Sequence, residues 1–263
     1  ARPGIPDIPG ILQSPAVDFI STTNGAGRGT LVGVHDHHFL SETDSIQKAG
    51  KLFYYEADTR TCDSQWISKL RPDIDPAGEY NQPGWFGPET VGQSLELLKS
   101  VFARVMITGT AQWWFDIWGG WYDRPEIIQL FAQMQRLGTE SINSANNSVA
   151  QIAVIVDETA LCYLPTNTGF DWLPGQMDEL GRIGAPYEIY LLDDLKQIDS
   201  TQYRMAIFLN TCVLSSSQRN LILNKWMNRG RTLLWLYAPG LIQDNLAVDN
   251  MSSLLQMEFA MTT

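Results

Sequence analysis

A carboxylate stands at the end of an apolar run early in the chain. The run KLFYYEA, residues 51–57, carries Glu56, and Asp58 and Arg60 follow directly. An unpaired carboxylate beside a buried strand costs free energy, whereas an ionised carboxylate near a guanidinium can act as a nucleophile. We therefore interpret Glu56 as a candidate catalytic anion, with Asp58 and Arg60 orienting it or bordering its substrate. The alternative is a structural pairing of Glu56 with Arg60 at a strand end.

Aromatic side chains gather in the same half of the chain. Six of the nine Trp lie between residues 66 and 121, and the stretch QWWFDIWGGWYD holds four of them. Flat aromatic faces stack on the C–H groups of sugar rings while carboxylates accept hydrogen bonds from the hydroxyls, and ligand sites commonly combine aromatic and polar groups. The pattern predicts carbohydrate contacts by Trp113, Trp114, Trp118 and Asp116. A well-packed aromatic core is the alternative.

A polar loop follows the first apolar run and could face the same substrate. It includes Asn24 and the stretch HDHHF, which holds the three His of the chain. His35 and His37 alternate as on an extended segment and could share a metal with a nearby acid, but no further ligand is obvious. We place Asn24 and His37 among the sugar contacts and predict no metal and no cofactor. An ordinary polar loop is the remaining alternative.

Composition and charge exclude several functions. The chain has 263 residues and a net charge of −11, which disfavours binding to nucleic-acid phosphates. It has no run of about 18 apolar residues, so we expect no membrane span. Cys62, Cys162 and Cys212 are too far apart to suggest a zinc site or a disulfide framework. We expect reduced thiols and favour a cytoplasmic location, although an export signal would lie upstream of residue 1.

A parallel sheet must position the residues of the first half. Apolar runs at 16–22, 51–57 and within 105–117 predict strands, and helical spacing at 88–106 and 124–144 predicts helices. Strands that alternate with helices form parallel sheets, and such folds place their active sites at the carboxyl ends of the strands. In all three strands the chemically interesting residues stand at that end. The sequence therefore predicts an α/β fold with one site over these strand ends.

The second half has its own pattern. A polar stretch at 143–150 predicts a domain boundary. Further elements follow it, with strands at 151–157, 185–195, 203–210 and 231–239 and a Ser-capped helix at 215–230. This order predicts a doubly wound, flavodoxin-like domain without a glycine-rich phosphate loop. Cys212 follows one of these strands, but the glycine elbow of a nucleophilic thiol and a nearby His are absent from the second half.

The run GKLFYYEADTRT resembles the segment that carries the nucleophile in clan A glycoside hydrolases, and it is closest to the β-galactosidase-like group of glycoside hydrolase family 42. SPAVDFISTTNG resembles the sixth strand of that barrel with its loop, and ARVMITGTAQWWFDIWGGWYD resembles the eighth. The resemblance implies a partial (β/α)8 barrel, its last three strands, at residues 1–145. It also implies a flavodoxin-like domain at 150–263, which mediates trimerisation in that group.

The resemblance also implies roles for three residues, but the matching acid/base residue is missing from this sequence. It makes Glu56 the nucleophile and places Trp113 and Trp114 at the floor of the sugar site. The family's acid/base belongs to an Asn-Glu pair, and no Asn-Glu dipeptide occurs here. A whole barrel also needs about 250 residues.

We therefore expect a portion of a retaining hydrolase for β-galactosides or related glycosides. Its partners would be a carbohydrate substrate and either the missing N-terminal barrel portion or further copies, a trimer by resemblance. The alternative is a non-catalytic module from a degenerate or truncated barrel that binds sugar or serves assembly.

Overall fold

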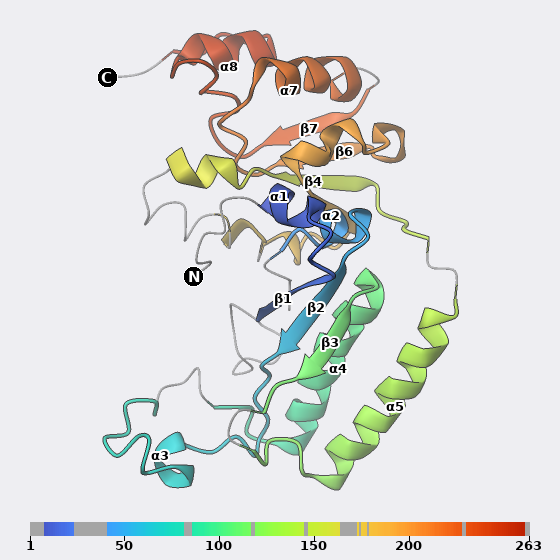
Figure 1. Cartoon of the computed structure of the whole chain (residues 1–263), viewed down its shortest axis with the longest axis vertical. Helices are drawn as coiled ribbons and strands as arrows, with labels where there is room; N and C mark the ends of the chain where they lie inside the picture. The colour runs from blue at the N-terminus through green and yellow to red at the C-terminus, as the bar shows by residue number, and fades with distance from the viewer. Residues whose placement is uncertain are drawn as a thin grey trace. The chain divides into compact units, whose positions relative to one another are not determined.

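The computed structural model describes residues 8–23, 41–81, 86–116, 119–144, 147–163, 173, 175–177, 179–227 and 230–260. The chain divides into two compact units (Figure 1). The first unit contains Phe19–Ser41 and Leu52–Asn147, and the second contains Ala1–Asp18, Glu42–Lys51 and Ser148–Thr263. Both units are built from parallel strands and helices, so the predicted α/β class is confirmed.

The first unit contains the strands β1 (Phe19–Thr23), β2 (Leu52–Ala57) and β3 (Ala111–Trp114), which pair in parallel in the order β1-β2-β3. Its described helices are α3 (Ile67–Leu70), α4 (Val91–Thr108) and α5 (Pro125–Ile142). The third strand is shorter than its apolar run suggests, because the residues up to Thr108 continue α4 and Gly109 ends that helix with a φ of 63°.

The two faces of β2 differ in burial. Phe53, Tyr55 and Ala57 are buried, whereas Leu52 is 47% exposed and Glu56 is half-buried. Successive side chains of a strand point to opposite faces, so one face of the sheet meets the helices and the other carries Glu56. The helix side is closed by a cluster in which α4 and α5 pack together, formed by Leu98, Trp121, Tyr122, Ile127, Leu130 and Met134.

The two long helices begin in different ways. Thr90 caps α4 and forms a capping box with Gln93, which satisfies donors that the first turn leaves open. The N-cap position of α5 is Arg124, without a side-chain hydrogen bond, rather than the neighbouring Asp123, and Pro125 occupies the first turn. Proline tolerates that position because its missing N–H is not needed there.

The second unit contains β4 (Ile152–Val156), β5 (Tyr187–Leu191), β6 (Met205–Phe208) and β7 (Thr232–Trp235), paired in parallel in the order β5-β4-β6-β7. Its described helices are α1 (Ile8–Gln13), α2 (Thr43–Lys48), η2 (Thr159–Tyr163), η3 (Leu192–Lys196), η4 (Ser200–Gln202), α7 (Ser216–Leu221), the π-helical η5 (Ile222–Trp226) and α8 (Val248–Leu255).

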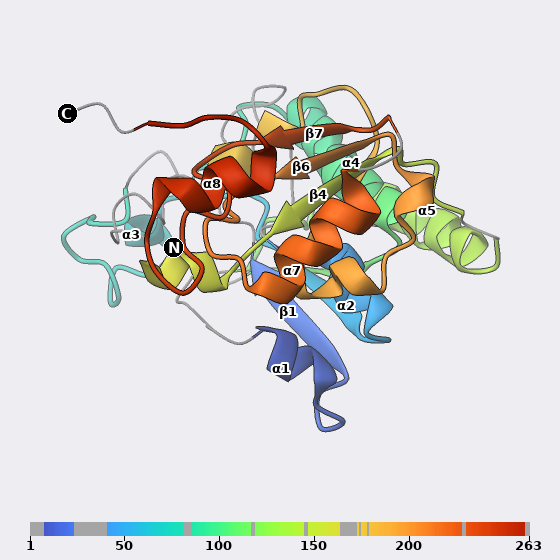
Figure 2. The ribbon, with the colours of Figure 1, turned by 90° about the horizontal axis from the view of Figure 1, so that it is seen from above.

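Both faces of this second sheet are buried. Ala153 and Ile155 of β4 pack into a cluster with residues of η5 and α8, and Figure 2 shows α7 and α8 over the sheet. Val154 and Val156 pack into a second cluster on the other face. When both faces of a sheet are covered, the sequence of a central strand is apolar at every position. For this reason β4 shows no alternation of polar and apolar residues. None of the helices in the described part of the chain has the length and apolar character to cross a membrane.

A buried carboxylate closes β4 at its carboxyl end. Asp157 is 5% exposed, and its backbone N–H donates to Asn210 Oδ1 over 2.8 Å while its own Oδ1 accepts from Thr159 N–H over 3.0 Å. Burial raises the pKa of Asp157 from its usual 3.8 to about 7, against the opposing effect of the N–H donors. The folded chain therefore binds a proton at Asp157 more tightly than the unfolded chain does.

The buried carboxylate makes stability depend on pH. A raised pKa means that stability is lost as pH increases from about 4 to 7, by up to about 4 kcal/mol for this group. Asp157→Asn keeps an acceptor for Thr159 and removes the charge. We expect its free energy of unfolding, measured by urea denaturation, to exceed that of the wild type at pH 8 and to approach it at pH 4. The exposed Asp244→Asn serves as control, and a difference of the same size in that variant would contradict the assignment.

Candidate functional site

Glu56 lies at the carboxyl end of β2, between β1 and β3. It pairs in register with Thr23 of β1 and with Trp113 of β3. Residues that pair in register point to the same face of a parallel sheet, so Glu56 and Trp113 share the face opposite the helices. Both side chains are half-buried. The structure thus brings together the carboxylate and one of the aromatic residues that the sequence singled out.

The residues directly after β2 are buried in the interior of the unit. Asp58, Thr59, Arg60 and Thr61 are all buried, and Arg60 is 0% exposed. Arg60 Nη1 forms an ion pair with Asp58 Oδ1, and its guanidinium carbon lies 4.2 Å from the centre of the Trp121 ring. A buried guanidinium needs a countercharge, and the face of an aromatic ring can replace part of its lost hydration through a cation–π contact. The Trp121 indole provides that face. Asp58 and Arg60 therefore pair with each other inside the unit, directly after the strand that carries Glu56.

Hydrogen bonds fasten the segment after β2 to the segment after β3. The Thr61 hydroxyl donates to the Trp121 carbonyl, and the Tyr122 hydroxyl donates to the Thr59 carbonyl over 2.8 Å. Burial raises the pKa of Tyr122, and the charges of Asp116 and Asp58 add to this, so the hydroxyl stays a donor. The ends of two neighbouring strands are thereby held as one assembly.

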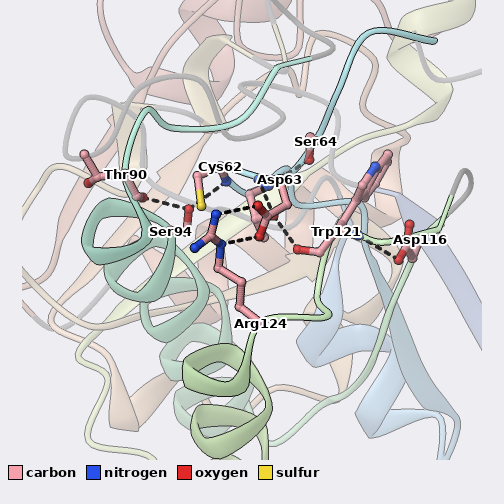
Figure 3. A network of polar contacts seen from close by, with 9 residues as sticks. Cys62, Asp63, Ser64, Thr90, Ser94, Asp116, Trp121 and Arg124 are labelled. Carbon is pink, nitrogen blue, oxygen red and sulfur yellow. Dashed lines mark hydrogen bonds and ion pairs between the residues drawn. The ribbon is translucent and has the colours of Figure 1, made fainter. Parts of the chain in front are cut away.

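Asp116 lies near the start of the segment after β3, and one of its carboxylate oxygens accepts a hydrogen bond from that segment. Its Oδ2 accepts from the Trp121 N–H over 3.1 Å, as Figure 3 shows. Its Oδ1 is buried and has no hydrogen-bond partner within the described ranges. An acceptor in this state is suited to a donor from a ligand, because a buried acceptor without a partner costs free energy.

Further contacts join the segment after β2 to α4 and to the start of α5. Arg124 donates from Nε and Nη2 to the two carboxylate oxygens of Asp63, over 2.6 and 2.9 Å, and Figure 3 shows this paired geometry. The Cys62 N–H donates to Ser94 Oγ of α4 over 2.9 Å. Gly87 lies so close to Thr61 that a Cβ on it would overlap the Thr61 backbone. Only glycine permits this approach.

Trp113 and Trp114 lie on opposite faces of β3. The Trp113 ring meets Phe115 edge-on, with centroids 5.3 Å apart, on the Glu56 face. The Trp114 ring stacks on Phe131 of α5 at 4.8 Å and lies near Tyr122 at 5.9 Å. The structure therefore does not bring Trp114 together with Glu56. Three further predicted contacts, Asn24, His37 and Trp118, lie outside the described residues.

Sequence reasoning missed two of the residues that organise this site. The sequence pattern places Trp121 among the clustered tryptophans without giving it a role, and it does not distinguish Tyr122. A signal did exist, because a fully buried Arg needs an aromatic or anionic neighbour and WYD offers both types. The sequence does not say which of several Trp provides that face, since the pairing joins residues 61 positions apart.

Other chemistry has less support among the described residues. Within those ranges, no group of three or more His, Cys, Asp or Glu could hold a metal ion, and the HDHHF stretch lies outside them. Burial raises the pKa of the Cys212 thiol to about 11, and the Asp157 charge adds to this. A thiol in that state is protonated at neutral pH and is a poor nucleophile. A groove of about 840 Å³ also exists, lined by second-unit residues such as Lys48, Asp193 and Gln218.

No protein-family model matches the sequence, and no curated protein matches it. The solved structures that this chain matches include the β-galactosidase from Bifidobacterium adolescentis, at 19% identity and a TM-score of 0.30, covering 43% of this chain and 58% of that one. The enzyme from the psychrophilic Marinomonas ef1 has 12% identity and a TM-score of 0.47, covering 80% and 44%. The enzyme from Bacillus circulans sp. alkalophilus has 12% identity and a TM-score of 0.48, covering 85% and 36%.

These values describe a distant similarity of the backbone and transfer no residue role. The chain spans between 36% and 58% of the length of these β-galactosidases.

The two Arg–Asp pairs of the site provide a matched comparison. Arg60→Met removes a cation that is wholly buried, leaves Asp58 without its countercharge, and should cost about 3–5 kcal/mol of unfolding free energy. Arg124→Met removes a cation whose side chain is 47% exposed, and should cost much less because solvent screens this pair. Urea denaturation of both variants measures the difference. Equal costs would mean that the Asp58–Arg60–Trp121 contacts do not hold the site.

Proposed function

We propose that this chain is the portion of a retaining glycoside hydrolase that carries the nucleophile, Glu56, and that its substrates are β-galactosides or related glycosides. The placement of Glu56 beside Trp113, on one face at the carboxyl ends of parallel strands, is the observation that carries the proposal. Parallel α/β folds build active sites at these ends. The resemblance of the GKLFYYEADTRT run to the nucleophile segment of family 42 supplies the reaction class.

The mechanism needs two carboxyl groups about 5–5.5 Å apart. The ionised Glu56 attacks the anomeric carbon, and the bond to the leaving oxygen breaks as a general acid gives that oxygen a proton. The product is a covalent glycosyl–Glu56 ester. Water then attacks the same carbon, the acid/base takes its proton, and Glu56 leaves as the carboxylate. The acid/base is not provided by an Asn-Glu pair of this chain, so in this proposal it comes from elsewhere in a complete barrel.

The remaining residues divide the work of binding. Trp113 stacks on the C–H face of the sugar, and Asp116 Oδ1 accepts a hydrogen bond from one of its hydroxyls. Asn24, His37 and Trp118, which lie outside the described residues, are proposed as further sugar contacts. Asp58 and Arg60 fix the segment after β2, and Trp114 supports β3 from the helix side through Phe131. No step of this scheme requires a metal or a cofactor.

The proposal extends to the architecture. Residues 1–145 supply the last three strands of a (β/α)8 barrel, although Ala1–Asp18 and Glu42–Lys51 of that range belong to the second unit. Residues 150–263 correspond to a flavodoxin-like, trimerisation-like domain. The open Glu56 face then meets the remaining barrel strands or another copy of the chain. The exposed apolar side chains of Phe19 and Leu52, which are register partners on that face, support this part of the proposal.

An activated aryl β-galactoside tests the nucleophile directly, because a good leaving group needs little help from an acid. We expect the chain to release the phenol and to become labelled at the peptide that contains Glu56, as mass spectrometry would show. Glu56→Gln should reduce release by about three orders of magnitude or more, since removing a covalent nucleophile removes most of the rate enhancement. Glu126→Gln, which changes an exposed Glu of α5, is the control. Equal loss in both variants would reject Glu56 as nucleophile.

A non-catalytic sugar-binding module is the second candidate, and the absence of any Asn-Glu dipeptide favours it. In that case an unactivated β-galactoside should bind without being hydrolysed, and Glu56→Gln should leave its affinity nearly unchanged. Trp113→Ala should weaken binding about tenfold, because it removes roughly 1–2 kcal/mol of apolar contact. Calorimetric titration separates the two functions, and binding that survives Trp113→Ala would reject the Glu56 face as the sugar site.

A further inference from the structure

The strand β5 stands at one end of the second sheet, and its outward N–H groups are covered by side chains rather than by another described strand. Asp44 Oδ2 accepts from the Ile189 N–H over 2.7 Å, and Ser45 Oγ accepts from the Leu191 N–H over 2.8 Å. The two donors are two residues apart, which is the spacing of the N–H groups on one side of a strand. Open strand edges pair with other chains, so covering them protects the sheet.

The covering helix comes from a distant part of the sequence. α2 belongs to the segment Glu42–Lys51, which stands 145 positions before β5 and directly precedes β2. Glu42, Thr43, Ser45 and Ile46 are each at most 4% exposed, so the first half of the segment is buried, whereas residues 48–50 are exposed. We call Asp44 and Ser45, with their bonds to Ile189 and Leu191, the edge clamp.

The side chains near Asp44 are a second carboxylate and tyrosine hydroxyls. Glu188 and Tyr190 face it from β5, and the Tyr203 hydroxyl, next to β6, joins the same group by donating to Glu188. The charged groups nearest to the clamp on the other elements are Lys48 of α2, which lies near Asp194, and Asp194 of η3, which bonds to Ser45. Glu188 repels an ionised Asp44, while the Ile189 N–H favours it.

The energetic consequence has a definite sign. Burial, opposed by the Ile189 N–H and aided by Glu188, raises the pKa of Asp44 from its usual 3.8 to about 6. When the segment Glu42–Lys51 leaves β5, the Asp44 carboxyl is again in water and its pKa returns to the usual 3.8. The clamp therefore holds a proton more tightly than the open segment does. Its closing equilibrium weakens as pH rises from about 4 to 6, and by about 50-fold between pH 4 and pH 7.

We propose that the segment Glu42–Lys51 is an acid-strengthened clamp, in which protonation of Asp44 fastens α2 onto β5 and ionisation loosens it. The protonated carboxyl keeps one carbonyl-type oxygen that accepts from Ile189, so the bond survives protonation while the buried charge is removed. Loosening uncovers the N–H groups of β5 and frees the chain that leads into β2. This inference is independent of the proposed glycosidase activity.

Hydrogen exchange of the Ile189 and Leu191 amides in the full chain measures the clamp. Protection factors are corrected for intrinsic exchange and divided by the protection of the central β4 amides, which removes pH effects on global stability. We expect the corrected protection of both amides to fall about 50-fold from pH 4 to pH 7. Asp44→Asn keeps the acceptor without the charge, and its protection should be the same at both pH values and higher than wild type at pH 7.

Two further variants make the result specific. Ser45→Ala removes the acceptor for Leu191, so the Leu191 amide should lose protection at both pH values. Asp249→Asn, which changes an exposed Asp of α8, should keep the wild-type pH profile. The proposal is overturned if wild-type protection is independent of pH, if Asp44→Asn retains the pH dependence, or if both amides exchange only together with the β4 core.

Discussion

The buried guanidinium of Arg60 is the interaction on which the Glu56 end of the first unit depends. It lies between the Asp58 carboxylate and the Trp121 ring, with no exposed surface. A charge in this position is tolerated only while both neighbours stay in place, because the cost of removing it from water far exceeds any single contact. The segments after β2 and β3 therefore have one mutual arrangement. Glu56, at the end of β2, is held at the face where Trp113 stands because the residues that follow it cannot move independently.

The second sheet meets a different requirement. Its central strand β4 is covered on both faces by apolar clusters, so stability there comes from packing. At β5 the requirement is for hydrogen-bond acceptors, and Asp44 and Ser45 provide them from a segment far away in the sequence. Both units thus place carboxylates where burial is costly, Asp58 in the first and Asp44 and Asp157 in the second. Asp58 has a cation beside it, while burial leaves Asp44 and Asp157 with raised pKa values.

The strands and long helices are predictable from the local pattern of apolar residues, because each element buries one or both of its faces. β2, β4 and β6 coincide with the predicted apolar runs, and α4 and α5 with the predicted helical spacing. The position of Glu56 at a strand end also follows from sequence. The prediction for the aromatic cluster was less complete. Adjacent residues of a strand point to opposite faces, so the neighbours Trp113 and Trp114 separate into one residue beside Glu56 and one against Phe131.

The sequence by itself determined the α/β class, the parallel order implied by alternating strands and helices, and the candidate carboxylate at the end of β2. The tertiary structure alone decided that Arg60 turns inward to Trp121, that Tyr122 ties the two strand ends, and that α2 covers β5. The reason is physical. Periodicity along the chain reports which residues are buried, but not which distant partner satisfies a buried charge or donor. Those partners, 61 and 145 positions apart, are selected only when the chain has folded.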